Sequence, residues 1–258
     1  MSSHTESSVL AERDRSTSSG STWESNTVFT PRHYGVGAAR GVKSVAGGAM
    51  MNAVLLLISG ASCAGKTSVR TAIAADLEPA VTAVELRHLG AVPDPPTLEW
   101  RQRMAERAVR AAIALEETGG HLLLAGDPVA PGELVAAPSA ALIDIAVCLL
   151  DVGERAQRER LRRRGDPEEL FGRHVAFADW MRAHARDPRH MPHVLSTGGW
   201  SDMRWSRLTS MPADEWRISI IDGSDMTRAE ANQAALQWVT DAIAGRAPAF
   251  RRSATSTR

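Results

Sequence analysis

Apolar residues gather into five short runs along the middle of the chain, and helix-like patterns separate these runs. The runs span residues 54–58, 81–86, 121–127, 143–151 and 216–222. Unbroken runs of branched residues and leucine are typical of strands that are buried on both faces. Because the strands alternate with helices, we predict an α/β fold with a five-stranded parallel sheet and flanking helices. Ligands of such sheets bind beyond the carboxyl ends of the strands.

Helical spacing of apolar residues predicts the segments that connect the strands. The expected helices span residues 67–77, 97–118, 153–164, 168–186 and 227–244. Thr97 and Thr227 are expected N-caps, and Glu230 stands at capping-box spacing from Thr227. Gly165 is well suited to end the third helix in a left-handed conformation.

The same patterns divide the chain into one folded domain and two tails. Residues 1–50 are rich in Ser, Thr, Gly and charge and hold few large aliphatic side chains, so we expect them to be disordered. Residues 246–258 are expected to form a second disordered tail. Between the tails, residues 51–245 are expected to form the α/β domain, with a lid and an acceptor-binding insert at about 153–215.

The turn between the first strand and the first helix reads Gly-x-x-x-x-Gly-Lys-Thr. A strand, a glycine-bearing turn and a helix start are what a phosphate-binding loop requires, because backbone N–H groups and a helix N-terminus attract anions. We expect Lys66 to reach the β- and γ-phosphates of a nucleotide and the Thr67 hydroxyl to bind Mg²⁺. The residues expected to bind the nucleotide are Gly60, Ala61, Ser62, Cys63, Ala64, Gly65, Lys66, Thr67 and Ser68.

Composition adds support and sets limits. Lys43 and Lys66 are the only lysines in a chain whose other basic residues are arginines, so a lysine in the loop stands out. The 30 basic and 30 acidic residues cancel, which argues against global attraction to nucleic acid or to an anionic membrane. No apolar run approaches the ~20 residues of a membrane-spanning helix. Cys63 and Cys148 make no disulfide framework, so a cytoplasmic location is expected.

Two carboxylates end predicted strands at the edge of the sheet where the loop lies. Asp127 ends the third strand, at a place where a carboxylate can hold Mg²⁺ directly or through water. The alternative for Asp127 is a turn-initiating role before Pro128. Glu85 lies near the end of the second strand and is a candidate base for an acceptor hydroxyl. The alternative for Glu85 is a solvated or ion-paired edge residue with Arg87 as its partner, and the sequence leaves both open.

Arginines crowd the helix expected at 153–164. Arg160 and Arg164 lie one turn apart and share a helix face. Closing that face over a triphosphate would offset charge on the transferring group, so both are candidate catalytic residues. The alternative is a solubilising surface with Glu154 and Glu159 as ion-pair partners. The histidines at 174–193 fit no compact zinc pattern, and a substrate-pocket or structural role is favoured for them. The tryptophans at 180, 200 and 205 are expected either in the core or stacked on a flat acceptor, and the sequence leaves both open.

With these motifs, the stretch from about 53 to 244 resembles the P-loop kinases of the nucleotide and small-molecule kinase group. The phosphate loop, the strand that ends at Asp127 and the run from Glu159 to Gly165 carry the resemblance. The last of these looks like the lid start of adenylate-kinase-type enzymes, where R-L-x-x-R supplies two phosphate-contacting arginines.

Residues 119–129 are similar to the corresponding strand of chloramphenicol-phosphotransferase-like proteins. Those proteins carry two acids there, and this chain has Gly126 in place of the first. The catalytic base of those proteins, an aspartate after the second strand, would correspond to a position near Glu85, where this chain has a glutamate. Ile221-Asp222-Gly223-Ser224 matches the place where such kinases close around the adenine.

The resemblance implies an ATP- and Mg²⁺-dependent phosphotransferase that acts on a small hydroxylated acceptor. Lys66 and the loop amides would hold the phosphates, and Thr67 and Asp127 would position Mg²⁺. Glu85 or Asp127 would orient or deprotonate the acceptor hydroxyl.

The acceptor is expected to lie against residues 87–104 and the segment 174–205. One alternative is a P-loop ATP-binding regulatory protein with slow ATP hydrolysis and a protein partner. The other is a nucleic-acid 5′-kinase, against which the balanced charge argues.

Overall fold

A computed structural model of the chain describes residues 52–253. Its centre is a five-stranded sheet in which all neighbouring strands are parallel, in the order β2-β3-β1-β4-β5. The strands are β1 (Val54–Ser59), β2 (Val81–Val84), β3 (His121–Ala125), β4 (Asp144–Asp151) and β5 (Ser219–Asp222). The predicted five-stranded parallel sheet is therefore confirmed.

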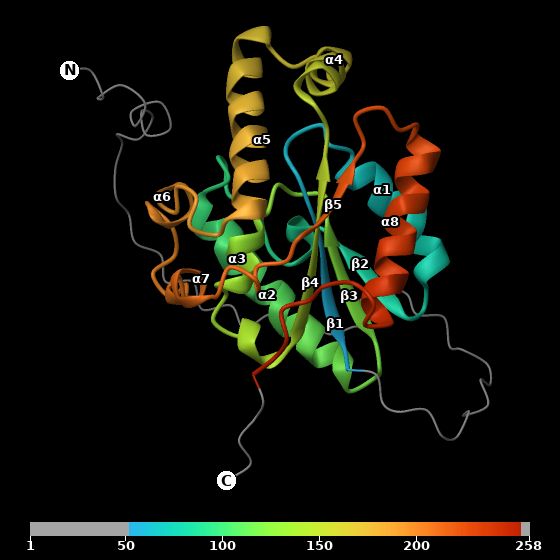
Figure 1. Ribbon diagram of the computed structural model, residues 1–258, viewed down its shortest axis with the longest axis vertical. Helices are drawn as coiled ribbons and strands as arrows, with labels where there is room; N and C mark the ends of the chain where they lie inside the picture. Colours follow the sequence, from blue (N-terminus) through green and yellow to red (C-terminus); the bar gives the residue numbers. More distant parts are fainter. Residues whose placement is uncertain (1–51, 254–258) are drawn as a thin grey trace. The chain divides into compact units, whose positions relative to one another are not determined.

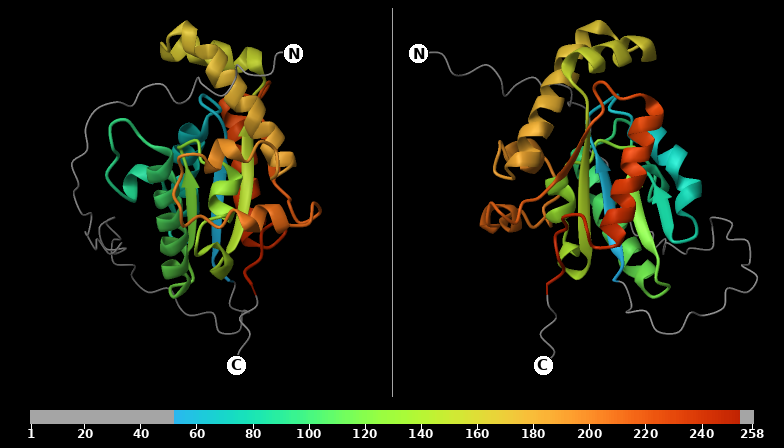
Figure 2. Two further views of the ribbon diagram at one scale, coloured as in Figure 1. Left: turned by 90° about the vertical axis from the view of Figure 1, so that its left-hand side faces the viewer. Right: turned by 45° about the vertical axis from the view of Figure 1, so that its right-hand side comes forward.

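Helices cover both faces of this sheet. They are α1 (Lys66–Leu77), α2 (Leu98–Glu116), α3 (Pro131–Val135), α4 (Glu154–Arg164), α5 (Phe171–Arg186), α6 (His193–Ser196), α7 (Ser206–Ser210) and α8 (Arg228–Ile243). Single 3₁₀ turns lie at Leu86–His88, Ala140–Leu142 and Glu168–Leu170. Figure 1 shows α1 and α8 on one side of the sheet and α2, α3 and α5 on the other. Figures 1 and 2 both show α4 beyond the carboxyl ends of the strands.

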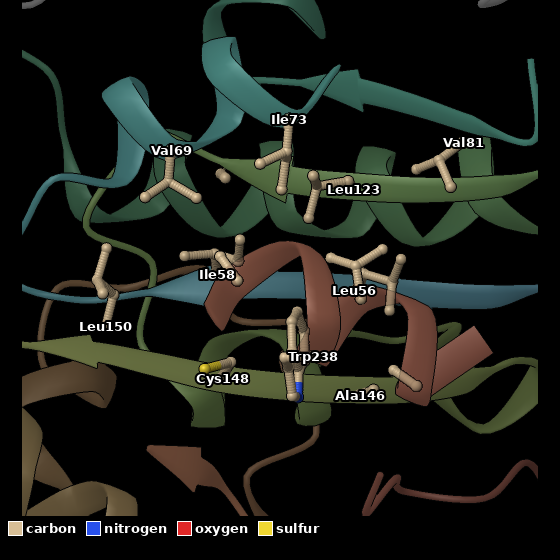
Figure 3. Close-up of a cluster of buried hydrophobic side chains, with 14 of the residues drawn as sticks. Leu56, Ile58, Val69, Ile73, Val81, Leu123, Ala146, Cys148, Leu150 and Trp238 are labelled. Atoms are coloured by element: carbon tan, nitrogen blue, oxygen red, sulfur yellow. The ribbon is translucent and has the colours of Figure 1, made fainter. Parts of the chain in front are cut away.

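An apolar cluster under α1 and α8 fixes the strand that leads into the phosphate loop (Figure 3). Leu56 and Ile58 of β1 pack between Ile73 of α1 and Trp238 of α8, beside Cys148 of β4. All six residues of β1 are buried. The loop that follows β1 therefore starts from a rigid, central strand.

The expected helix caps are present. The Thr97 side chain accepts a hydrogen bond from the backbone N–H of Trp100, at 3.1 Å. Thr227 likewise accepts from the backbone N–H of Glu230, whose carboxylate accepts in turn from the backbone N–H of Thr227. These bonds satisfy N–H groups that a helix start otherwise leaves open.

The fifth strand is shorter than expected. It begins at Ser219 rather than at 216, because Trp216 is buried and packs against side chains of the insert. The Trp216 indole Nε1 donates to the carbonyl oxygen of His184 in α5, at 3.0 Å. An apolar residue that extended the strand pattern in the sequence thus belongs to a neighbouring cluster.

The expectation of a disordered tail from residue 246 is wrong for residues 246–253. Phe250 forms an antiparallel bridge with Ile145 at the start of β4. The carboxylate of Asp144, which is 3% exposed, accepts from Arg251 Nη1 and from the backbone N–H of Arg252, both at 2.8 Å. A buried carboxylate needs such partners, and this segment supplies them.

The expected disorder of residues 1–50 lies outside the described residues, and so do positions 254–258 of the second tail. Within residues 52–253, no helix has both the length and the apolar character that crossing a membrane requires.

Candidate nucleotide site

The loop between β1 and α1 has the backbone that its glycines predict. Gly60 has φ 150°, and a Cβ placed there would come within 2.4 Å of the carbonyl oxygen of Leu150. Gly65 has φ 109° and immediately precedes α1, which begins at Lys66. Cys63 also has a positive φ, at 62°. The loop therefore turns tightly and ends at a helix N-terminus, the arrangement that binds phosphate.

Lys66 lies inside this loop rather than in solvent. Its residue exposure is 5%, and its Nζ donates to the carbonyl oxygen of Ala61 at 2.8 Å. Burial lowers the pKa of Lys66 to about 8, and the neighbouring Asp127 charge opposes that shift only in part. A buried ammonium group whose charge is not fully compensated favours an anionic ligand.

A cavity of about 740 Å³ opens over the loop. Its lining includes the predicted loop residues from Ser62 to Ser68 but not Gly60 or Ala61. Arg87 and Gly126 to Pro128 contribute at the ends of β2 and β3. Gly223, Met226, Thr227, Arg228, Ala231 and Asn232 contribute at the β5–α8 side. Because β1 lies between β3 and β4 in the sheet, these two groups flank the loop from opposite sides.

The charge of this cavity is strongly one-sided, although the chain as a whole is neutral. The cationic lining residues are Lys66, Arg87, Arg160, Arg163, Arg164 and Arg228. Asp127 is the single carboxylate in the same lining. Such a concentration of positive charge in a concave site attracts polyanions.

Asp127 stands where the sequence predicts it, just beyond β3. Its Oδ2 accepts from the backbone N–H of Leu86 at 2.7 Å, which fixes the carboxylate. No residue in the described range 52–253 donates to its Oδ1, and the residue lines the cavity. Thr67 lies in the first turn of α1 and is exposed toward the same cavity. One carboxylate and one hydroxyl beside a phosphate site match the sparse protein ligation that Mg²⁺ uses with nucleotides.

Glu85 does not occupy the position of a base. β2 ends at Val84, and Glu85 is 3% exposed and does not line the cavity. Its Oε1 lies 3.0 Å from Arg70 Nη2, and its Oε2 lies 2.7 Å from Arg87 Nε. A carboxylate that is held between two guanidinium groups and lies outside the cavity lining does not face an acceptor bound in the cavity. The catalytic role expected of Glu85 is therefore corrected, and the ion-paired alternative, with Arg87 as one partner, is what the structure shows.

The α4 arginines differ in what they contact. Arg160 donates through Nη1 to the carbonyl oxygens of Cys63 and Ala64, at 3.3 and 3.2 Å, and through Nη2 to that of Gly223, at 2.9 Å. It therefore ties α4 to the loop. Arg164 donates to Asp166 and borders the cavity, with half of its side chain exposed.

A third arginine on α4, Arg163, also lines the cavity, although sequence reasoning did not single it out. Within residues 52–253, no acidic side chain forms an ion pair with Arg163, so its charge can act on a ligand in the cavity.

Solved structures similar to this chain were found, but no family model and no curated protein sequence matches it. A gluconokinase from Sinorhizobium meliloti 1021 has 16% identity and a TM-score of 0.43, over 76% of this chain and 98% of its own. A putative kinase from Chloroflexus aurantiacus has 14% identity and a TM-score of 0.42, over 76% and 99%. A protein called APE1195 has 16% identity and a TM-score of 0.44, over 75% and 98%.

The fold is that of the P-loop kinases. The sheet order, the loop backbone and the burial of Lys66 identify this fold. The resemblance inferred from the sequence agrees with all three.

Gln157 is a further residue that shapes this P-loop and that sequence reasoning missed. It is completely buried, and its Nε2 donates to the carbonyl oxygen of Ser62 at 3.0 Å. A glutamine among the arginines and glutamates of α4 was the available signal, because an uncharged polar side chain is easier to bury. Together with Arg160 it gives α4 two anchors on the loop.

The segment 174–205 does not contribute to the cavity lining, contrary to expectation. It packs against α2 instead. The side chain of Gln102, which is buried, donates to the carbonyl oxygen of Leu195 and accepts from the backbone N–H of Trp200, both at 2.7 Å. His184 is also buried, accepts from the backbone N–H of Gly132 and stacks on Trp180. Of the expected acceptor contacts, only Arg87 from residues 87–104 lines the cavity.

Proposed function

We propose that this protein is an ATP- and Mg²⁺-dependent phosphotransferase that acts on a small hydroxylated acceptor. The observation that carries the proposal is the buried Lys66 at the base of a cavity with six cationic side chains and one carboxylate. A site for an uncharged ligand would gain nothing from a buried ammonium group, whose desolvation is costly. A triphosphate offsets that cost.

The residues present fit the nucleotide and its metal. The backbone N–H groups of the loop from Gly60 to Ser68 and the ammonium group of Lys66 would hold the phosphates. The Thr67 hydroxyl and the Asp127 carboxylate would hold Mg²⁺, which neutralises charge on the phosphates when bound. Gly223 and the start of α8 would border the base, because they line the cavity on the β5 side.

Asp127 is the remaining candidate for orienting the acceptor. Its Oδ2 is occupied by the Leu86 N–H, so Oδ1 is the atom that would receive a hydrogen bond from the acceptor hydroxyl or from a metal-bound water. Arg163 and Arg164 would offset charge on the transferring group from the α4 side, as a lid does, while Arg160 supports the loop. Two free cysteines, Cys63 and Cys148, fit a cytoplasmic location.

The test is a search for a labelled product. Purified protein, Mg²⁺ and γ-labelled ATP are incubated with a pool of small metabolites, and a compound that gains the label is isolated. Lys66→Ala should remain folded and lose the transfer. ATP consumption that no metabolite raises, but that a protein partner raises, would contradict the proposal and favour a regulatory ATPase.

A further inference from the structure

Arg87 differs from the other cations of the cavity in its position. Lys66, Arg160, Arg163 and Arg164 come from the loop and α4, where a nucleotide's phosphates would lie. Arg87 comes from the turn after β2, and the sheet order puts β2 and β3 on the side of β1 that is remote from the β5–α8 wall. Its cavity neighbours there are Asp127 and Pro128. The acceptor end of the site therefore has a cation of its own.

The structure holds Arg87 in place through Glu85. The Glu85 side chain is 4% exposed and is fixed at one oxygen by Arg70, while its other oxygen lies 2.7 Å from Arg87 Nε. The same side chain packs so closely on Gly126 that a Cβ there would lie 2.6 Å from it. Glu85 is thus a rigid support, and Arg87 is fixed at the base of its guanidinium group.

The charge of this trio is not neutralised. Arg70 and Arg87 share one carboxylate, so the three side chains carry a net positive charge. Within residues 52–253, Glu85 is the one ion-pair partner of Arg87, and it contacts Nε rather than the two terminal nitrogens. The Arg87 side chain is 63% exposed and lines the cavity. Two free terminal nitrogens of a guanidinium group match the two oxygens of a carboxylate or phosphate.

We propose that Arg87, oriented by Glu85, binds an anionic group of the acceptor, so that the substrate is a hydroxylated carboxylate or a hydroxylated phosphate monoester. This inference rests on the phosphotransferase function proposed above. Arg87 would touch the substrate, and Glu85 is a positioning residue. The role gives a physical reason for a buried glutamate at a point where a base was expected.

The first experiment compares acceptors and variants. Label transfer from ATP is measured for a panel of hydroxylated compounds, sorted into carboxylates, phosphate monoesters, and neutral sugars, polyols and nucleosides. We expect anionic compounds alone to be good acceptors. Arg87→Gln should raise the acceptor KM about 10- to 100-fold, the loss expected for hydrogen bonds to a charged group. The KM for ATP should change less than about twofold.

Further variants separate substrate binding by Arg87 from the positioning of Arg87 by Glu85. Arg87→Lys should recover part of the lost affinity, because the charge remains and the paired nitrogens do not. Glu85→Gln should raise the acceptor KM with little change in kcat. Arg155→Gln is the matched control, because Arg155 is 85% exposed, does not line the cavity and has only a 4.0 Å contact with Asp225. A neutral best acceptor, or an equal rise in the KM for ATP in Arg87→Gln, would overturn the inference.

A second experiment does not depend on turnover. Thermal unfolding is followed with Mg²⁺, a saturating non-hydrolysable ATP analogue and added inorganic phosphate as the probe. Phosphate should raise the melting temperature of the wild type and of Arg155→Gln more than that of Arg87→Gln. If this difference appears but no compound is ever phosphorylated, the anion site stands and the kinase proposal fails. If a neutral compound is phosphorylated and the difference is missing, the kinase proposal stands and the anion site fails.

Discussion

The buried ammonium group of Lys66 makes stability depend on pH in a way that can be measured. The pKa of Lys66 is about 8 in the folded protein and 10.5 in the reference state. Because the unfolded chain binds the proton more tightly, the free energy of unfolding should rise with pH between these values. The contribution is absent at pH 7, where Lys66 is protonated in both states.

The size of the effect follows from the two pKa values. Between pH 7 and pH 9.5, a shift from 10.5 to about 8 gives a gain of about 2 kcal/mol in the free energy of unfolding. Lys66→Met removes the titrating group and keeps a side chain of similar length. The difference in stability between the wild type and Lys66→Met should therefore change by about 2 kcal/mol across this range, in favour of the wild type at high pH.

Urea unfolding at pH 7 and pH 9.5 measures the difference. Both proteins should carry Cys63→Ser, because the ordinary pKa of a thiol, 9.0, lies in this range, burial raises the pKa of Cys63, and its charge interacts with Lys66. All remaining groups titrate alike in the two proteins and cancel. If the two stability curves run parallel between these pH values, Lys66 is not desolvated and the electrostatic account of the loop is wrong.

Nucleotide binding should reverse the same shift. Phosphates beside Lys66 favour its charged form, so its pKa should rise when ATP and Mg²⁺ bind. With a starting pKa of about 8, binding at pH 8.5 should take up about 0.75 proton, against about 0.1 at pH 7. Calorimetry in two buffers of different ionisation enthalpy gives these numbers. Equal heats in both buffers at pH 8.5 would contradict the expected contact.

Three other predictions concern stability and are checked by urea unfolding. Gly60→Ala should cost about 2 kcal/mol or more, because its Cβ would meet the Leu150 carbonyl oxygen, whereas Gly172→Ala, which meets nothing within 4 Å in α5, should be neutral or stabilising. Burial lowers the pKa of His184 to about 4 from 6.5, so the free energy of unfolding should fall by about 2 kcal/mol from pH 7 to pH 5, and His184→Gln should lack this fall. Phe250→Ala should cost about 2–4 kcal/mol if the segment 246–253 is part of the fold, and an unchanged midpoint would contradict that packing.

The parts of the site that the sequence predicts are those that local geometry decides. The loop is a contiguous run between a buried strand and a helix start, so its glycines, Lys66 and Thr67 fall into place without knowledge of the rest of the fold. Asp127 is likewise fixed by the end of β3. Each position depends on the element that directly precedes it, and the sequence shows that element plainly.

Glu85 shows why the chemical role of some site residues could not be predicted from the sequence. Its place near the end of β2 was predicted correctly, but its chemistry depends on Arg70, which lies 15 positions earlier, in α1. Helix α1 packs beside β2, and the sequence of neither segment alone indicates the ion pair between Arg70 and Glu85. A carboxylate at the edge of a sheet has the same sequence signature whether it takes a proton or holds an arginine.

The segment 174–205 is absent from the cavity lining for a related reason. Gln102 in α2 is hydrogen-bonded to Leu195 and Trp200, which lie 93 and 98 positions later in the chain. These contacts pack the segment 174–205 against α2. The sequence did hold one signal. Gln102 falls on the helix face of Leu98 and Ala105, and a polar residue within an apolar stripe indicates a buried hydrogen-bonding partner rather than solvent.

Arg160 and Arg164 share a helix face as predicted, but they make different contacts. Arg160 and Gln157 attach α4 to the loop through its carbonyl oxygens, so a swing of the whole helix would break four hydrogen bonds to the loop and to Gly223. The termini of Arg163 and Arg164 need only side-chain rotation to move within the cavity. Closure over a transferring phosphoryl group is therefore cheaper through these side chains than through a moving lid. Arg160→Ala should weaken nucleotide binding by loosening the loop, while Arg163→Ala should lower kcat and leave the KM for ATP nearly unchanged. The opposite pattern in steady-state kinetics would show that Arg160 is the one that reaches the phosphates.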